Sequence, residues 1–499
     1  MSGSNRKPAH FVLIPFLAQG HMIPMIDLAR VLSLRGALVT VVTTPANASR
    51  CAYVVDRAND AAGGDEPPIR LVEIRFPCAE AGLPEGCESI DLIPSADLIH
   101  NFFTAFGMLR EPLLLHLRQQ RGRPKPSCLV SDSCVLWTGD VARELRIPRL
   151  IFESPSCFYL LCSHAVSELE HAEDSASSPF EPLLVPELPH RVETVRAQSS
   201  RFFDLPGFKR YREEWVEDQS SAHGFLINTF RELESPYLDG YEKAVGKRVW
   251  PVGPFALCYK DGEKVSRGNR VATDVADRIL KWLDANEPGS VVYVNFGSLV
   301  KNSPSHLQAV GLGLEASNRP FLWAVKQEET SGEEMEAWLS LFEERTRARG
   351  LTTRGWVPQV LILSHPSVGG FMTHCGWNST LEAVAAGVPM ITWPHFWDQF
   401  LNEKLVVNVL GIGVALKPNT EAVFISHLSH GLISGEDVEK AVKELMDGGE
   451  EGKERRKRAR ELGEKARKAM EEGGSSYEQA NLMIQRVLEL GEELDPDCI

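Results

Sequence analysis

The chain has 499 residues, too many for one ordinary hydrophobic core, so we expect two domains. Its 43% hydrophobic and 24% charged residues are typical of a globular protein in water. The net charge of −15 disfavours nucleic acid and anionic membranes as partners. Its ten cysteines form no CxxC pair that would indicate a zinc site.

The apolar run at residues 10–18 could be mistaken for the core of a signal peptide. It is followed by Gln-Gly-His and an amphipathic helix instead of a cleavage site. No stretch approaches the roughly 20 apolar residues that a membrane helix needs. Cys498 is misplaced for prenylation. We therefore expect a cytoplasmic protein without a membrane anchor.

Strand and helix patterns alternate along the first half of the chain. A buried parallel strand is predicted at residues 10–16, a helix at 24–35 and a second strand at 37–44, which together make one βαβ unit. Further strands are predicted at residues 127–132, 149–153 and 224–228.

The second half repeats this alternation, with strands predicted at residues 290–296, 320–325 and 368–373. The pattern predicts an α/β fold with two doubly wound domains. The expected parts of the chain are a first domain at 1–250, a Pro-, Gly- and charge-rich linker at 251–274, a second domain at 275–474, and a last segment at 475–499 with a helix over 475–490.

A histidine, His21, follows the first predicted strand. Open α/β sheets place their ligands at the carboxyl ends of strands, and an imidazole with a pKa of about 6.5 can remove a hydroxyl proton near neutral pH. Asp132 ends another apolar strand, so its carboxylate could fix the tautomer of His21 and stabilise the imidazolium. Taken alone, His21 could equally be a helix-entry residue and Asp132 a helix N-cap.

The most informative stretch runs for 44 residues from Trp356 to Gln399. It predicts a buried strand at 368–373, a polar turn, and a helix that stops at Gly387. Such a unit presents free backbone N–H groups and a partial positive charge to an anion. Three side-chain donors lie at the start of the helix, namely His374, Asn378 and Ser379.

The two ends of this stretch offer groups that suit a base and a sugar. Trp356 provides a flat face for a base, and Gln359 could reach a base edge or a ribose oxygen. Asp398 and Gln399 provide acceptors and donors for sugar hydroxyls.

Each of these residues also has a structural explanation when it is taken singly. Trp356 could be core packing, and His374 could be a structural residue at a helix start. Ser379 and Glu382 have the spacing of a capping box. In this order and spacing, however, the whole set has no comparable structural explanation.

The set resembles the secondary-product glycosyltransferase signature of plants, which is the donor box of the family-1 UDP-sugar-dependent glycosyltransferases. The match covers Trp356, His374, Trp377, Asn378, Ser379, Glu382, Asp398 and Gln399. The resemblance implies two facing Rossmann-like domains (the GT-B architecture), a nucleotide-sugar cleft between them, and a last helix that returns to the first domain.

The resemblance also implies a role for each site residue. The residues implied at the nucleoside are Trp356, which would stack on uracil, Val357, Gln359 and Glu382, which would take the ribose hydroxyls. The residues implied at the diphosphate are His374, Asn378, Ser379 and, from the Gly297-Ser298 loop, Ser298. The residues implied at the sugar are Trp377, Asp398, Gln399 and Thr138.

On the acceptor side, His21 matches the catalytic base of the family and Asp132 its charge partner. Trp397 departs from the pattern, because a small residue is expected at this position beside the acceptor, and it should narrow the pocket. The pocket itself would be built by the irregular segments 76–103, 154–158 and 187–203.

The resemblance implies an inverting glucosyltransferase that uses UDP-glucose, because Gln at the position of Gln399 accompanies glucose in the family. The acceptor would be a hydroxyl of a small hydrophobic plant metabolite (a flavonoid, terpenoid, steroid or hormone). No metal and no cofactor are expected, and the protein is expected to be a monomer. The alternative is a non-catalytic UDP-sugar-binding or sensor protein, which would have no need of His21 and Asp132.

Overall fold

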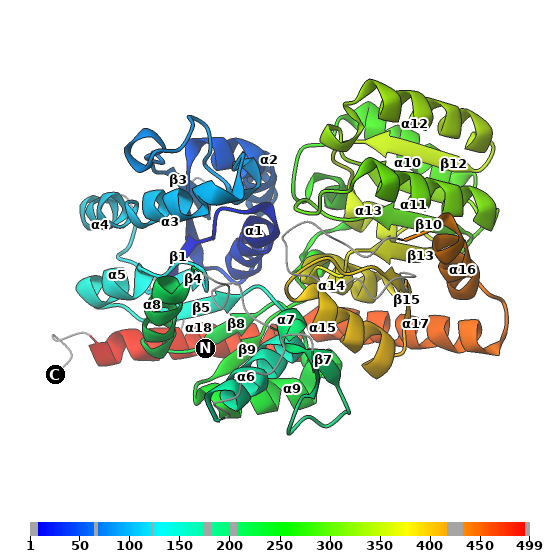
Figure 1. The fold of residues 1–499 in the computed structure, drawn as a ribbon. Coiled ribbons are helices and arrows are strands. Elements are labelled where there is room, and N and C mark those ends of the chain that lie inside the picture. Colours follow the sequence, from blue (N-terminus) through cyan, green and yellow to red (C-terminus); the bar gives the residue numbers. More distant parts are fainter. Residues whose placement is uncertain are drawn as a thin grey trace.

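The computed structural model describes residues 8–63, 68–120, 123–172, 181–199, 207–416 and 433–494. Two α/β lobes lie side by side, each built on a parallel sheet (Figure 1). The first lobe has a seven-stranded sheet of order β3-β2-β1-β4-β5-β8-β9, and the second lobe has a six-stranded sheet of order β12-β11-β10-β13-β14-β15. This arrangement confirms the predicted fold class of two Rossmann-like domains.

The central strands of the first lobe are buried along their whole length, as parallel strands covered on both faces must be. All seven strands of this sheet, central and edge, are β1 (His10–Ile14), β2 (Leu38–Thr43), β3 (Ile69–Glu73), β4 (Cys128–Asp132), β5 (Arg149–Glu153), β8 (Phe225–Ile227) and β9 (Val249–Pro251). A separate antiparallel pair consists of β6 (Pro182–Leu184) and β7 (Glu193–Val195).

Helices lie on both faces of this sheet (Figure 1). They are α1 (Gln19–Ser33), α2 (Pro45–Ala62), α3 (Ile99–Gly107), α4 (Arg110–Gln119), α5 (Thr138–Leu145), α6 (Cys157–Ala172), α7 (Arg196–Ser199), α8 (Lys209–Ser220) and α9 (Arg231–Val245). The first helix begins at Gln19, five residues before the predicted start at Pro24. His21 therefore lies in the first helical turn.

The second lobe contains β10 (Val291–Asn295), β11 (Phe321–Val325), β12 (Gly350–Arg354), β13 (Val368–Thr373), β14 (Met390–Thr392) and β15 (Gly413–Ala415). Its helices are α10 (Thr273–Asp284), α11 (Pro304–Ser317), α12 (Glu333–Thr346), α13 (Gln359–Leu363), α14 (Trp377–Ala386), α15 (Gln399–Lys404), α16 (Gly435–Leu445) and α17 (Glu450–Met470). Close packing explains the glycine at position 369 inside β13, because a Cβ there would lie 2.0 Å from the carbonyl oxygen of Gly289.

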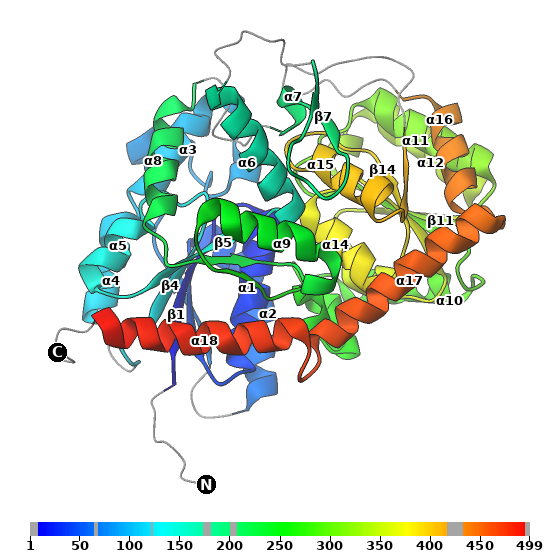
Figure 2. The same ribbon diagram turned by 90° about the horizontal axis from the view of Figure 1, so that it is seen from below.

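The last helix, α18 (Ser475–Leu494), runs from the second lobe along the first (Figure 2). Three of its buried side chains, Ala480, Met483 and Val487, belong to the hydrophobic core of the first lobe. Among the described residues, no helix combines the length and apolar character that crossing a bilayer requires.

Candidate active site between the two lobes

The facing ends of the two lobes are joined by side chains that follow strands of both sheets. Three hydrogen bonds cross between the lobes: Asn378 Nδ2 to the Gly20 carbonyl (2.6 Å), Trp377 Nε1 to the Asn228 carbonyl (2.9 Å), and Ser156 Oγ to Asn402 Oδ1 (2.7 Å). The segment after β1 and the start of α14 therefore lie against each other where the two lobes meet, and we call this region the cleft.

His21 and Asp132 form a hydrogen-bonded pair on the first lobe. His21 Nδ1 lies 2.8 Å from Asp132 Oδ2, and the other carboxylate oxygen accepts the backbone N–H of Cys134 at 2.9 Å. Asp132 is fully buried, whereas the His21 side chain is 23% exposed. The pair thus fixes one imidazole nitrogen and leaves Nε2 as the nitrogen that can meet a substrate proton.

Charges from both lobes act on His21. Burial alone lowers the pKa of the imidazole, but the Asp132 carboxylate more than offsets burial, with smaller contributions from Asp398 and Glu153, so the pKa is raised above 6.5. Asp398 belongs to the second lobe. Because its charge acts on His21, the end of the 356–399 stretch lies close to that imidazole.

His374 has the opposite electrostatic character. Burial, together with the charge of Lys326, lowers the pKa of its imidazole to about 3, so the ring is neutral at physiological pH. The His374 ring packs closely against two glycines, because a Cβ on Gly297 or on Gly376 would come within 2.5 Å of it. Its Nδ1 is buried and has no hydrogen-bond partner among the described residues, as expected of a group held ready for a ligand.

The N-terminus of α14 points into the cleft. The helix starts at Trp377, and its N-cap residue, Gly376, has no side chain that could cap it. The Asp398 carboxylate accepts the backbone N–H of Trp377 in the first turn. Asn378 Oδ1 is also buried without a partner among the described residues. Because the helix starts two residues before Ser379, the capping box considered for Ser379 and Glu382 is wrong.

The residues predicted to bind the nucleoside form a polar network of hydrogen bonds. Gln359 Nε2 donates to Ser379 Oγ (3.0 Å) and to Glu382 Oε2 (2.8 Å). Gln359 Oε1 accepts from Asn295 Nδ2 (2.9 Å) and from the Tyr293 hydroxyl (3.1 Å). The amide orientation of Gln359 is therefore determined by its neighbours on both sides.

Trp356 and Val357 precede this network. A Cβ on Gly268 would lie 2.6 Å from Cζ2 of the Trp356 indole, so the linker packs against that ring. The indole Nε1 is buried without a partner among the described residues. Val357 is buried in the core, which leaves its backbone as the part that can serve a ligand.

Asp398 and Gln399 begin α15. Burial raises the pKa of the Asp398 carboxyl to about 6, although Asn402 Nδ2 donates to it at 2.7 Å and opposes that change. Gln399 Oε1 accepts the backbone N–H groups of His395 (2.9 Å) and Phe396 (3.2 Å). The Nε2 amide group of Gln399 is therefore the part that can face a sugar.

Three predicted site residues make contacts of their own within the protein. Thr138 is fully buried, and its hydroxyl donates to Ser131 Oγ (2.8 Å) and accepts from Arg149 (2.8 Å), so it supports the first lobe from inside. The Trp377 indole N–H donates to the Asn228 carbonyl at 2.9 Å, and its backbone N–H donates to the Asp398 carboxylate, so both of its N–H groups have partners. Ser298 is exposed, and its carbonyl accepts from Lys326 Nζ at 2.8 Å.

Trp397 lies in the loop between β14 and α15 with a φ of 51°. This left-handed conformation is rare for a bulky residue and is a mark of strain retained at functional sites. The ring makes an edge contact with Phe396, with centroids 4.7 Å apart. The predicted contact with an acceptor stays a prediction.

Four polar residues of the site were not identified from the sequence. They are Glu153, Arg267, Asn295 and Asn402. Glu153 carries the signal that had identified Asp132, namely a carboxylate at the end of an apolar strand. Arg267 lies in a span interpreted only as a linker, and no sequence signal marks it.

Three side chains beside the proposed base carry atoms of the kind that bind metal ions. A nitrogen of His21, an oxygen of Asp132 and the sulfur of Cys134 lie within 4.8 Å of one another. Burial raises the pKa of the Cys134 thiol well above its usual range, so the thiolate that a metal needs is disfavoured. The residues fit a proton-transfer pair better than a metal site.

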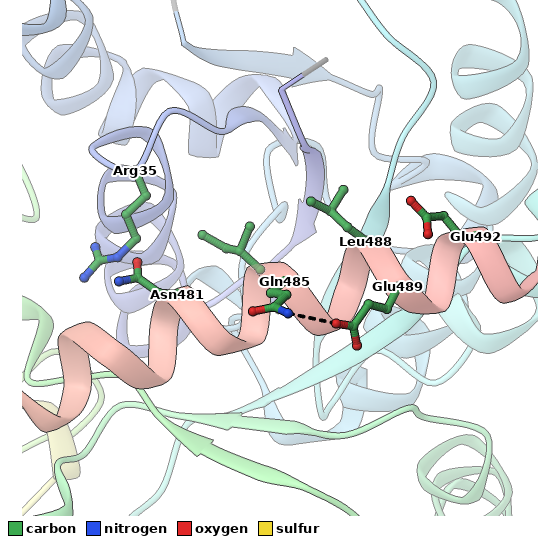
Figure 3. A pocket seen from close by; sticks show the side chains of 7 residues that line it. Arg35, Asn481, Gln485, Leu488, Glu489 and Glu492 are labelled. Carbon is green, nitrogen blue, oxygen red and sulfur yellow. Dashed lines mark hydrogen bonds between the residues drawn. The ribbon is translucent and has the colours of Figure 1, made fainter. Parts of the chain in front are cut away.

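An open hollow of about 470 Å³ lies elsewhere, between Arg35 and α18 (Figure 3). Its lining includes Glu489 and Glu492. Arg35 follows the carboxyl end of α1, whereas His21 lies in the first turn of that helix. The two residues are therefore about 21 Å apart along the helix axis. This hollow is therefore not part of the cleft.

Two family profiles match the chain. The profile described as glycosyltransferase, N-terminal domain, matches residues 8–257. The profile described as UDP-glucoronosyl and UDP-glucosyl transferase matches residues 270–455. The chain is 46% identical over 490 residues to UDP-glycosyltransferase 73C6 of Arabidopsis thaliana, covering 97% of each protein. It is 46% identical over 488 residues to UDP-glycosyltransferase 73E1 of Stevia rebaudiana, covering 96% of each.

Solved structures share the fold over the whole chain. Glycyrrhiza uralensis UGT73P12, complexed with glycyrrhetinic acid 3-O-monoglucuronide, has a TM-score of 0.86 and 34% identity over 97% of this chain and 96% of that one. Phytolacca americana UGT2, complexed with UDP-2fluoro-glucose and pterostilbene, has a TM-score of 0.75 and 25% identity over 96% of this chain and 99% of that one.

Fold and relatives together define the class of the protein, a glycosyltransferase with two Rossmann-like lobes. The chain belongs to the plant family-1 UDP-glycosyltransferases, which confirms the resemblance found in residues 356–399.

Proposed function

We propose that this enzyme transfers glucose from UDP-glucose to a hydroxyl of a small hydrophobic plant metabolite, with inversion at the anomeric carbon. The acceptor class is a flavonoid, terpenoid, steroid or hormone. The observation that carries the proposal is the hydrogen-bonded pair of His21 and Asp132, because a protein that only binds a UDP-sugar has no use for a charged partner that raises the pKa of a cleft imidazole.

The proposed chemistry is one displacement. His21 Nε2 removes the acceptor proton while the acceptor oxygen forms a bond to the anomeric carbon. The bond from that carbon to the UDP oxygen breaks, and its electron pair leaves with UDP. Attack from the face opposite UDP converts an α-linked donor into a β-glucoside. Asp132 stabilises the imidazolium that forms.

The departing diphosphate would be stabilised by the N-terminus of α14, where the N-cap residue Gly376 provides no side-chain cap and the helix dipole is preorganised toward developing negative charge. The neutral His374 and the side chain of Asn378 would add hydrogen bonds to it. The chain's own groups thus supply what the leaving group requires, so we propose no metal and no cofactor.

Two features support the donor and the acceptor. In the relatives, UGT2 contains UDP-2fluoro-glucose together with pterostilbene, which are a sugar nucleotide and a small aromatic molecule. In this chain, the ring of Phe16 lies 5.2 Å from the His21 ring and is surrounded by Phe102, Phe103 and Phe106. The four phenylalanines are buried in the core of the first lobe, so they give the base an apolar surrounding from behind, which is compatible with a hydrophobic acceptor.

The test is to incubate the purified protein with UDP-glucose, UDP-galactose or UDP-glucuronic acid and a panel of phenolic and terpenoid alcohols. We expect a hexose addition by mass spectrometry with UDP-glucose, and a β-linkage from the proton coupling at the anomeric carbon. An α-linked product would contradict inversion. UDP-sugar binding without any transfer across the panel would favour the sensor.

A further inference from the structure

Arg267 connects both lobes through a side chain that is almost completely buried. It lies in the linker, and its Nε donates to Asp27 Oδ2 of α1 at 2.8 Å. Its Nη1 donates to Glu382 Oε1 of α14. One guanidinium therefore joins a carboxylate of the first lobe to a carboxylate of the second.

The first-lobe end of this bridge is itself rigid. Asp27 is fully buried, and its second oxygen accepts the hydroxyl of Tyr259 at 2.6 Å. A buried carboxylate without a cation is strongly destabilising, so Arg267 satisfies Asp27 and Glu382 together. Its planar fork suits this task, because Nε and Nη1 point toward different partners from fixed directions.

The second-lobe end leads into the proposed nucleoside site. Glu382 Oε2 accepts from Gln359 Nε2 at 2.8 Å, and Gln359 in turn accepts from Asn295. Asn295 Oδ1 accepts the backbone N–H of Gly297 at 3.0 Å. A continuous series of hydrogen bonds thus extends from α1 through Arg267 to the loop beside His374.

The residue after Arg267 makes an independent contact with the same site. Gly268 has a φ of +89°, and a Cβ there would lie 2.6 Å from the indole of Trp356. The linker therefore approaches both the ring proposed to stack on uracil and the carboxylate proposed to bind ribose.

Glu382 retains capacity for a ligand in this arrangement. An ionised carboxylate has about four acceptor positions, and Arg267 and Gln359 use two of them. The remaining positions suit two neighbouring hydroxyl donors, which is the pattern of a ribose 2′,3′-diol. The guanidinium orients the carboxylate and leaves acceptor positions on it free.

We propose that Arg267 is a positioning residue for the nucleoside half of the donor. It holds Glu382 at the orientation that receives the ribose hydroxyls, and through Asp27 it makes that orientation depend on the closed arrangement of the lobes. The proposal rests on the proposed function, because it requires that UDP occupies this cleft.

The experiment compares two ligands by calorimetry, UDP and 2′,3′-dideoxy-UDP, whose diphosphates and bases are the same. In the unchanged protein UDP should bind at least about tenfold more tightly, since hydroxyls that donate to a carboxylate contribute about 1.5–3 kcal/mol. In Arg267→Ala this ratio should fall toward one. In kinetics, KM for the UDP-sugar should rise while kcat changes less.

Arg30→Ala is the matched control. Arg30 also links α1 to the linker, through Glu263 at 2.6 Å, with similar burial, but it has no contact with Glu382. It should lower thermal stability to a similar extent and leave the UDP to dideoxy-UDP ratio unchanged. Arg267→Lys keeps the charge but has no fork, and should give an intermediate ratio in a folded protein.

A double-mutant cycle with Glu382→Gln completes the test. If Arg267 acts through Glu382, adding Arg267→Ala to Glu382→Gln should change the ratio no further. Additive effects, an unchanged ratio in Arg267→Ala, or tighter UDP binding by that variant would each overturn the proposal. Failure of the unchanged protein to bind UDP would instead refute the proposed function.

Discussion

The two sides of the cleft are built in different ways. On the second lobe, the groups from Trp356 to Gln399 come from one segment, and glycines and buried hydrogen bonds fix their positions. On the first lobe, the side chains come from three separate segments: His21 from the first turn of α1, Asp132 from the end of β4 and Glu153 from the end of β5. A site made from one segment leaves a readable pattern in the sequence, whereas a site assembled from distant strand ends leaves isolated residues.

The difference extends to rigidity and to specificity. On the second lobe, the proposed donor side, buried polar atoms without a partner among the described residues are held in fixed positions, which suits one constant ligand. The acceptor side uses irregular segments, and of the predicted segment 187–203 residues 200–203 lie outside the described part of the chain. Loops carry the variable part of a binding site because the scaffold tolerates their change. We therefore expect substitutions on the second lobe to impair donor binding strongly, whereas substitutions in the irregular segments of the first lobe should change acceptor choice and be tolerated.

Replacing His21 by alanine is the strongest test of this separation. We expect kcat to fall by about 10²–10⁴-fold, because general-base assistance is lost. UDP binding should stay close to that of the unchanged protein, since the donor groups belong to the other lobe. Steady-state kinetics and calorimetry on the same preparation check this. Substantial remaining turnover would show that the two sides are not divided in this way.

Asp132→Asn should have the next largest effect, a loss of about 10²-fold, at the lower end of the range for acid–base groups. The neutral imidazole is the active form, so kcat/KM should decline as pH falls through the pKa of His21, which lies above 6.5. Without the Asp132 charge, burial lowers that pKa, and the acid limb should move to lower pH. A limb that does not move would remove His21 from the role of base.

Gly376→Ala tests the rigidity of the donor side. Its Cβ would come within 2.5 Å of the His374 ring, and overpacking of this kind costs about 1–3 kcal/mol. We therefore expect UDP to bind about 5–150-fold more weakly, while acceptor selectivity is retained. Gly332→Ala, where a Cβ meets nothing within 4 Å, is the control in the same lobe.

Gln399→His should give the smallest change, a shift of donor preference toward UDP-galactose by about 2–10-fold, the size of one neutral hydrogen bond. The histidine ring cannot accept from both backbone N–H groups that Gln399 Oε1 holds, so the polar group facing the sugar moves. Competition between the two donors, followed by mass spectrometry, measures the shift. An unchanged ratio would separate Gln399 from sugar recognition.

Much of the fold follows from local pattern, because buried parallel strands are continuous apolar runs that β1, β4 and β13 display plainly. The helix in the 356–399 stretch also follows from local pattern, because Asn378 and Ser379 lie in the first turn of α14 and the helix stops at Gly387. The capping-box spacing of Ser379 and Glu382 does not mark its start, since the helix begins at Trp377. The resemblance to the family implies a sugar contact for Thr138, whereas in the structure the helix that it begins turns its hydroxyl toward Arg149.

Pairings between distant residues are where a single sequence carries no signal. Arg267 contacts partners that are 240 and 115 residues away in the chain, at Asp27 and Glu382. Its surroundings have the composition of a spacer, and only the packing of both lobes gives it a role.

The crossing of α18 has a consequence for how this protein is made. Met483 and Val487 fill the core of the lobe that is synthesised first, yet they are translated more than 230 residues after its last strand, β9. Domains usually fold in the order in which they leave the ribosome. In this chain, the apolar surface of the first lobe that α18 covers stays exposed until α18 has been synthesised. We therefore expect the two lobes to finish folding at about the same time.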